Sequence, residues 1–275
     1  MFAPSASPDP ARYRRARNAN LRAAQGAATA CERAVLSHAS AAIAWDLPVV
    51  GRAVEQPCLT VQSRTALRSL AKVHLHRATL DEILQVSGYG ATPVARTVAD
   101  LSREHGIDTG LAAADAALYS GLTTKEELLS VVARQSRWPG VKAARRVAEF
   151  ADERSESPLE SISRLRMDKH HLPPPRPQAL ICDEWGVLIA RSDFYWDEYG
   201  VMGEADGAMK WEHDPKVRDA HDEQTRFLES LGLIVVRWGW AELRAFDSVV
   251  RRLRLGFARG ARPGSPLRRW QVRHK

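Results

Sequence analysis

The chain contains few cysteines and no long apolar run. Its 275 residues include three cysteines, Cys31, Cys58 and Cys182. Their number is odd and no two of them form a C-x-x-C pair, which excludes a disulfide framework and a zinc site built from cysteines. No apolar run approaches the roughly 20 residues that a bilayer-spanning helix needs, and Met1 is not followed by the apolar core of a signal peptide. We therefore expect a cytoplasmic protein with no membrane partner.

Two further kinds of site lack their sequence signatures. No glycine-rich phosphate loop is present, because Gly200, Gly203 and Gly207 do not lie between a strand and a helix at the required spacing. Hydrolysis of nucleoside triphosphates is therefore not indicated. His170 and His171, with His213 further on, lack the helical spacing of metal ligands, so we expect no zinc site.

The positive charge is concentrated at the carboxy-terminal end. The formal net charge is +7, yet the tail from position 251 onward contains eight arginines, one lysine and no acid, which leaves −2 for residues 1–250. Its glycines and prolines predict a helix end followed by a mobile basic arm. Such an arm can neutralise DNA phosphates without reading sequence, or it can be a solvated tail that only aids solubility. The arginines expected to contact DNA are Arg251, Arg252, Arg254, Arg259, Arg268 and Arg269.

Composition divides the chain into four segments, and the fold class that we expect is α/β (α+β). Residues 1–30 are predicted to be a disordered, basic segment, and residues 31–150 a mixed, mostly helical domain. Residues 151–258 form the second domain, and residues 259–275 the basic tail. Within 31–150, the pattern predicts a helix over 31–45, short strands at 58–62 and 73–77, a helix after Thr92-Pro93, and another that opens with a capping box at 123–126.

The second domain has a distinctive order of predicted elements. A helix opens at Ser157-Pro158, and the prolines between 173 and 177 then force an extended connection. Strand-like runs follow at 179–182, 187–196 and 201–206, separated by turns, and they predict a three-stranded antiparallel meander. Asp214-Pro215 begins a helix that Gly232 ends, and the apolar run 233–236 is typical of a buried strand. The order is helix, three strands, helix, strand.

The meander places carboxylates next to each other. If the turn at 197–200 is a plain hairpin, Trp196 faces Val201 and Asp193 stands opposite Glu204. Like charges in such a pair are destabilising, and Asp206 lies on the same face as Glu204 because side chains alternate along a strand. A hard divalent cation, Mg²⁺ or Mn²⁺, would compensate three such carboxylates and could activate water for hydrolysis.

A simpler interpretation needs no ion. Asp193 and Glu204 can lie on a solvated face and pair with Arg191 or Lys210. Against this, Ile189 and other apolar residues on both faces of the second strand indicate that the acids are partly covered. A partly covered carboxylate pair costs more free energy than one in water, which favours a bound ligand.

Three runs of the second domain carry a family pattern: RSDFYW at 191–196, GEADGAMKW at 203–211 and GLIVVRW at 232–238. They resemble the PD-(D/E)XK nuclease superfamily, in the branch similar to very-short-patch-repair endonucleases. The run SESPLES at 155–161 resembles the entrance helix of actinobacterial members. Runs at 36–42, 92–97 and 114–118 are similar to AbiEi-type antitoxins, which often form the amino-terminal part of such members.

The resemblance implies a restriction-endonuclease-like core, a Mg²⁺-dependent endonuclease activity on DNA, and a role in repair or in defence against phage and mobile elements. It makes Asp193 and Glu204 the metal-binding acids and Glu160 the helix acid that often completes the site. The family pattern places a lysine two residues after the Glu, whereas this chain has Asp206 there. Lys210 would then supply the catalytic cation.

Two alternatives stay open from the sequence. Glu160 stands three residues after Ser157, where a glutamate stabilises a helix start instead of binding metal. The whole chain can also be a non-catalytic DNA-binding regulator of the AbiEi antitoxin type, with the nuclease fold as a platform, or a module that neutralises a cognate toxin. A plain helix-turn-helix is not evident in residues 1–30.

Overall fold

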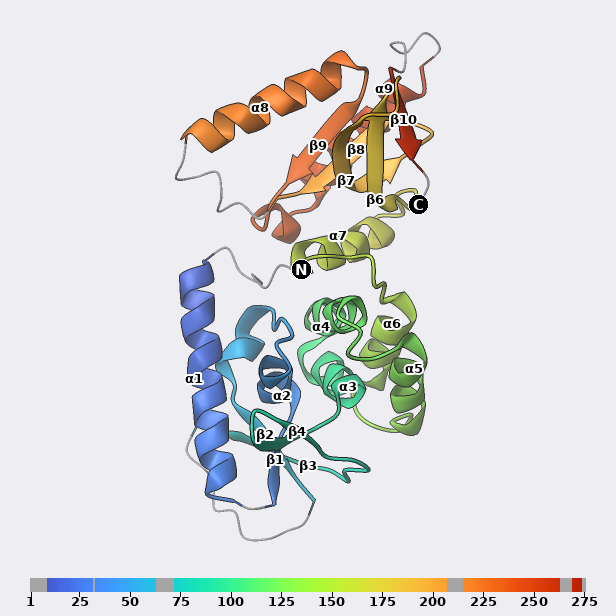
Figure 1. Ribbon diagram of the computed structural model, residues 1–275. Coiled ribbons are helices and arrows are strands. Elements are labelled where there is room, and N and C mark those ends of the chain that lie inside the picture. Colours follow the sequence, from blue (N-terminus) through green and yellow to red (C-terminus); the bar gives the residue numbers. More distant parts are fainter. Residues whose placement is uncertain (1–8, 32, 63–71, 207–214, 263–268, 274–275) are drawn as a thin grey trace. The chain divides into compact units, whose positions relative to one another are not determined.

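The computed structural model describes residues 9–31, 33–62, 72–206, 215–262 and 269–273, with side chains placed for all of these except 215–221. The chain forms two compact units, Met1–Ser161 and Ile162–Lys275 (Figure 1). The division falls inside helix α7 (Pro158–Lys169), whereas composition placed the boundary between residues 150 and 151. Among the described residues, no helix is long and apolar enough to cross a membrane.

The first unit combines a small mixed sheet with helices. Its described elements are α1 (Pro10–Thr29), β1 (Ala34–Leu36), α2 (His38–Ala44), a 3-10 turn (Gly51–Glu55), β2 (Cys58–Val61), β3 (His74–Arg77), β4 (Leu84–Val86), β5 (Tyr89–Ala91), α3 (Val94–His105), α4 (Ile107–Tyr119), α5 (Lys125–Arg134) and α6 (Val141–Phe150). The strands lie in the order β3-β2-β1-β5-β4. The predicted mixed, mostly helical character of this part is confirmed.

Two predictions for the first unit were wrong. Residues 10–29 are not a disordered segment: they form α1, which Asp9 caps through the Arg12 amide. Tyr13 and Asn20 are buried, and Asn20 donates to the Val54 carbonyl at 3.1 Å, so this helix belongs to the folded unit. The helix predicted over 31–45 starts only at His38, because residues 34–36 form β1: all three pair with β2, and Leu36 also pairs with Ala91 of β5.

The second unit has the predicted order of elements. After α7 come β6 (Arg176–Asp183), β7 (Leu188–Trp196), β8 (Val201–Ala205), α8 (Pro215–Ser230), β9 (Ile234–Trp238), a 3-10 turn (Glu242–Arg244), α9 (Asp247–Gly260) and β10 (Trp270–Arg273). The sheet order is β10-β6-β7-β8-β9, with β6, β7 and β8 antiparallel and β9 parallel to β8 (Figure 1). The helix, three-stranded meander, helix, strand prediction is confirmed.

Aromatic packing holds the meander against β9. The rings of Phe194 and Trp238 stack with centroids 5.6 Å apart, and the Trp238 indole donates to Ser163 Oγ at 2.7 Å. A Cβ atom on Gly203 would come within 2.7 Å of the Trp238 ring, so the glycine is needed for this close contact. The packing fixes the β7–β8 hairpin that carries the predicted site.

The prediction of a mobile basic arm was wrong for residues 269–273. This segment returns to the sheet as β10 and pairs antiparallel with β6, with Trp270 opposite Asp183. The Trp270 ring meets Tyr195 edge-on with centroids 5.6 Å apart. The apolar Trp270 and Val272 between basic residues provide the alternation that lets a charged segment cover a sheet edge.

Candidate functional site

The predicted hairpin register is confirmed. Trp196 pairs with Val201 and Phe194 with Gly203, so Asp193 and Glu204 are the next residues outward on β7 and β8. Asp193 Oδ2 accepts a hydrogen bond of 2.9 Å from the Ala205 amide. The Asp193 carboxylate therefore lies at the end of β8, beside the residue that follows Glu204.

Glu204 has a partner that the sequence analysis did not consider. Because β8 and β9 run parallel, Glu204 stands in register with Arg237, and Arg237 Nη2 lies 2.8 Å from Glu204 Oε2. Only 15% of the Glu204 side chain and 20% of the Arg237 side chain are exposed, so this ion pair is largely shielded from solvent. The positive charge that contacts Glu204 is therefore Arg237.

Burial shapes the protonation of these acids. Burial raises the pKa of Glu204, which Arg237 opposes and Asp206 reinforces. Burial also raises the pKa of Asp206, against the effect of Arg237. Glu204 and Asp206 thus lie in a partly desolvated patch of negative charge beside the Arg237 guanidinium.

The three acids do not form a tight ligand set in this structure. Among the described residues, groups of three or more potential ligands with one atom each within 4.8 Å of one another occur only in the first unit. Asp193, Glu204 and Asp206 are not such a group. Oxygen ligands of these residues would therefore have to draw together around an ion.

Glu160 has a structural role at the start of α7. Its Oε1 accepts from Ser157 Oγ at 2.7 Å and its Oε2 from the Glu156 amide at 3.0 Å, while its own amide donates to Ser157 Oγ at 3.2 Å. Glu160 is 6% exposed. These contacts are those of a helix cap, as the alternative interpretation of the sequence expected.

The predicted cations are only partly within the described residues. Lys210 and Arg268 lie outside them. Arg252 donates to the Arg237 carbonyl at 2.7 Å and pairs with Glu242, and Arg254 donates to the His170 carbonyl at 3.2 Å, so both have partners within the protein. The other three described arginines of the predicted set are exposed: Arg251, Arg259 and Arg269.

A cluster of histidines in the first unit was missed by the sequence analysis. His38, His74 and His76 gather around Glu104. His74 and His76 do not have the helical spacing of metal ligands. They are two residues apart, which places their side chains on one face of a strand. The predicted strand at 73–77 contained that signal.

The first unit also contains an open cavity of about 820 Å³ between the segment 79–84 and helices α3 and α5. Arg96, Arg134 and Trp138 are among its lining residues. It includes none of the site residues predicted from the sequence.

Comparison with known proteins identifies relatives of this chain, but none with a described function. No family model matches the chain, and no solved structure matches it. The chain is 33% identical over 172 residues to two proteins of Mycobacterium tuberculosis, Rv2248 of strain H37Rv and MT2308 of strain CDC 1551, which are both described as uncharacterized. The chain spans 62% of the length of these relatives, and the match covers 62% of this chain.

Proposed function

We propose that the second unit is a restriction-endonuclease-like domain that hydrolyses phosphodiester bonds in DNA with the help of Mg²⁺ or Mn²⁺. The observation that carries the proposal is the 2.9 Å hydrogen bond from the Ala205 amide to Asp193 Oδ2, which continues the β7–β8 register and puts the Asp193 carboxylate beside the residue that follows Glu204. The order of α7, the meander, α8 and β9 supports the same assignment. The resemblance to PD-(D/E)XK nucleases rests on the residues of these elements.

The carboxylates of the hairpin are suitable ligands for a hard cation. Asp193, Glu204 and Asp206 offer only oxygen ligands, which Mg²⁺ and Mn²⁺ prefer. The raised pKa of Glu204 and of Asp206 shows that negative charge here is costly, and a divalent cation would relieve that cost. Asp193 and Glu204 would hold the ion, and Asp206 would add negative charge beside them.

Each residue then has a defined task. When bound, the ion supplies an activated water and stabilises charge on the phosphate. Arg237 holds Glu204 in place through the 2.8 Å ion pair, and it offers positive charge next to a scissile phosphate. Arg251, Arg259 and Arg269 are exposed and would neutralise neighbouring phosphates. Lys210 stays a candidate for a second cation.

The test is cleavage of supercoiled plasmid in Mg²⁺ or Mn²⁺ by the full chain and by Asp193→Asn and Glu204→Gln. We expect each substitution to lower the cleavage rate by about 100-fold or more, because a metal ligand is lost. Asp197→Asn is the matched control: Asp197 lies at the turn of the same hairpin and pairs with Arg176 at 2.9 Å. It should cut at the rate of the unchanged protein.

Equal thermal unfolding of all variants would show that the fold is retained. Cleavage that persists in both Asp193→Asn and Glu204→Gln would reject the assignment of the site.

A second candidate function is a DNA-binding regulator of the AbiEi antitoxin type, which can also act on a cognate toxin. The Arg237–Glu204 ion pair favours it, because a resident guanidinium already compensates one of the acids. In this case the protein would shift the mobility of DNA in a gel. It would not cut the DNA, whichever divalent cation is added.

A further inference from the structure

The histidine cluster of the first unit is built by three separate elements. His38 is the first residue of α2, His74 and His76 lie on the edge strand β3, and Glu104 is in the last turn of α3. The parallel pairing of β3 with β2 aligns His74 with Cys58. Residues far apart in the sequence therefore meet at one end of this sheet.

The distances in the cluster match those between ligands of one metal ion. His38 Nε2 lies 3.3 Å from Glu104 Oε2, and His76 Nε2 lies 3.4 Å from the same oxygen. One atom each of His38, His76 and Glu104 lies within 4.8 Å of the other two. A tetrahedral zinc ion with bonds of about 2.0–2.2 Å separates its ligand atoms by about 3.3–3.6 Å.

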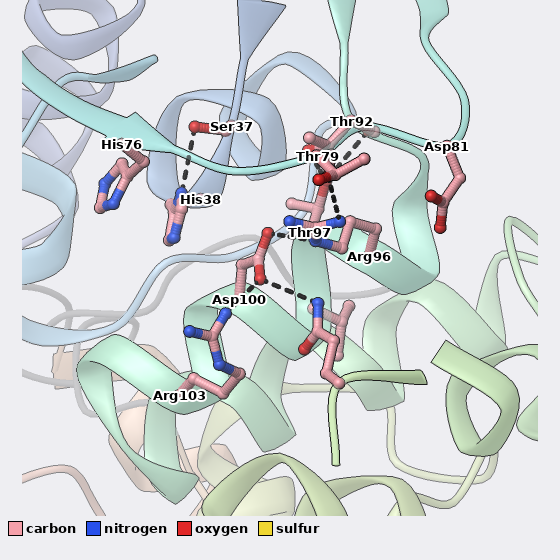
Figure 2. Close-up of polar contacts among 12 residues, drawn as sticks. Ser37, His38, His76, Thr79, Asp81, Thr92, Arg96, Thr97, Asp100 and Arg103 are labelled. Carbon is pink, nitrogen blue, oxygen red and sulfur yellow. Dashed lines mark hydrogen bonds and ion pairs between the residues drawn. The ribbon is translucent and has the colours of Figure 1, made fainter. Parts of the chain in front are cut away.

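The imidazoles of His38 and His76 have surroundings that suit metal ligands. Only 7% of the His38 side chain and 18% of the His76 side chain are exposed, so both rings lie largely inside the protein. His38 Nδ1 lies 3.0 Å from Ser37 Oγ (Figure 2), an outer contact of the kind that orients a ligating imidazole. The other ring nitrogen, Nε2, lies 3.3 Å from Glu104 Oε2. His76 Nε2 is buried and makes no hydrogen bond with any described residue.

Neighbouring positive charges are already compensated. Arg96 and Arg103, which come from the same helix as Glu104, both donate to Asp100 at 2.6 Å (Figure 2). The His38 and His76 rings stack with centroids 3.6 Å apart, an arrangement that two charged imidazolium rings would disfavour. The Glu104 carboxylate is the charged group that both rings contact.

We propose that the first unit binds one zinc ion through His38, His76 and Glu104, with the exposed His74 as the fourth ligand. His74 Nδ1 lies 3.2 Å from Glu104 Oε1, and the His74 side chain is 57% exposed, so it can turn toward the ion without repacking the core. The ion would tie the edge strand β3 to α2 and α3. The site is independent of the nuclease proposal, because its residues all belong to the first unit.

Cys58 is the competing ligand and we assign it no role. Its Sγ also lies within 4.8 Å of nitrogen atoms of His74 and His76. However, the Cys58 thiol already donates to the Gln56 carbonyl at 3.2 Å. Glu104 contacts His38, His74 and His76, so its carboxylate is the better partner.

The test uses the full chain stripped with a chelator, reloaded with Zn²⁺ and dialysed, with elemental analysis of the product. We expect one zinc per chain, and a rise in the midpoint of thermal unfolding of about 5 °C or more at saturating Zn²⁺. With Co²⁺ in place of Zn²⁺, we expect the intense visible bands of tetrahedral coordination and no thiolate charge-transfer band.

Variants identify the ligands. We expect His76→Gln and Glu104→Gln each to weaken zinc affinity by about 100-fold or more and His74→Gln by about 10-fold. Cys58→Ala and His105→Gln are the controls, because Cys58 is assigned no role and His105 is the neighbouring histidine on α3; both should bind zinc as the unchanged protein does. Unfolding in chelator shows whether each variant still folds.

Several results would overturn the proposal. The first is a zinc content below about one ion per ten chains in the unchanged protein. The second is a zinc affinity that stays undiminished in both His76→Gln and Glu104→Gln. The third is a Co²⁺ spectrum of octahedral coordination, in contrast to the tetrahedral site expected. A thiolate charge-transfer band that disappears in Cys58→Ala would show that Cys58, and not Glu104, is the ligand. The Co²⁺ spectrum needs only the unchanged protein, so it decides the question even if a variant fails to fold.

Discussion

Buried charge in the first unit converges on Asp100. This residue is fully buried, and its carboxylate accepts from Arg96 Nε and Arg103 Nη1 at 2.6 Å each and from Gln135 Nε2 at 3.1 Å (Figure 2). Both guanidinium groups also lie over the Trp138 ring, at 4.6 and 4.8 Å from its centroid. One carboxylate thus fixes two arginines of α3 and a side chain from the end of α5.

Replacement of this carboxylate should be strongly destabilising. We expect Asp100→Asn to lower the free energy of unfolding by about 3–5 kcal/mol, because two largely buried guanidinium groups lose their counter-charge. Urea unfolding in the presence of chelator measures this without interference from metal. Asp81→Asn is the control: Asp81 and Arg134 are exposed and 3.7 Å apart, and losing such a pair costs about 0–1 kcal/mol. Equal effects of the two substitutions would contradict the role given to Asp100.

The acids of the second unit show how far single residues could be predicted. Alternation along the strands was enough to make Asp193 and Glu204 neighbours, because the hairpin is local in sequence. Arg237 lies beyond α8 and reaches Glu204 only through the parallel β8–β9 register. A cation brought in by a long-range strand pairing cannot be assigned from the spacing of the acids.

Helix caps show how accurately a local pattern places an element. The sequence pattern located a capping box at 123–126, and the structure places it one residue later: Thr124 Oγ1 accepts from the Glu127 amide at 3.2 Å, and Glu127 Oε2 accepts from the Thr124 amide at 3.1 Å. Thr123 Oγ1 donates to the same Glu127 oxygen at 2.7 Å. Two adjacent threonines, followed after Lys125 by two adjacent glutamates, fit either register, and the structure has the later one.

The cap makes a pH-dependent contribution to stability. Hydrogen bonds from Thr123 and from the Thr124 amide lower the pKa of Glu127 in the folded protein. Its contribution is therefore complete above the unfolded pKa of about 4.3 and is lost as the pH falls through the folded pKa. We expect Glu127→Ala to lower the free energy of unfolding by about 0.5–1 kcal/mol at pH 7 and by less near pH 3.

Thermal unfolding at the two pH values, with Glu126→Ala as the control, measures this difference. Glu126 is in the same first turn but is not part of the capping box. A loss for Glu127→Ala that is the same at both pH values would show that the carboxylate is not the stabilising group.

At the scale of the whole chain, the basic tail has a structural role that its composition did not predict. The pairing of β10 with β6 covers an edge of the second sheet, and the Trp270–Tyr195 contact anchors it. We expect a chain that ends at residue 262 to lose about 2 kcal/mol or more of unfolding free energy, because a packed indole and a strand pairing are removed. Denaturant unfolding of this truncation measures the loss.

A truncation after Arg273 is the matched control and should unfold like the full chain. Weaker DNA binding by the chain that ends at 262, with unchanged stability, would instead restore the interpretation of the tail as a mobile arm.

The sequence by itself determined the features that depend on neighbours along the chain. These are the order of helix, meander, helix and strand, and the β7–β8 register that puts Asp193 next to Phe194 and Glu204 next to its partner Gly203. The sequence left two roles open for Glu160, and the structure shows the helix cap. Alternation, turn residues and capping patterns act within about ten residues, so they can be read from the sequence alone.

Only the tertiary structure decided which distant residues meet. It brought Arg237 to Glu204, packed α1 into the first unit, and returned the tail to β6 as β10. It also brought together His38, His76 and Glu104, although 66 positions separate the first from the last in the sequence. Each of these contacts depends on strand pairing or helix packing across long loops, where the free energy of burial, and not local pattern, selects the partner.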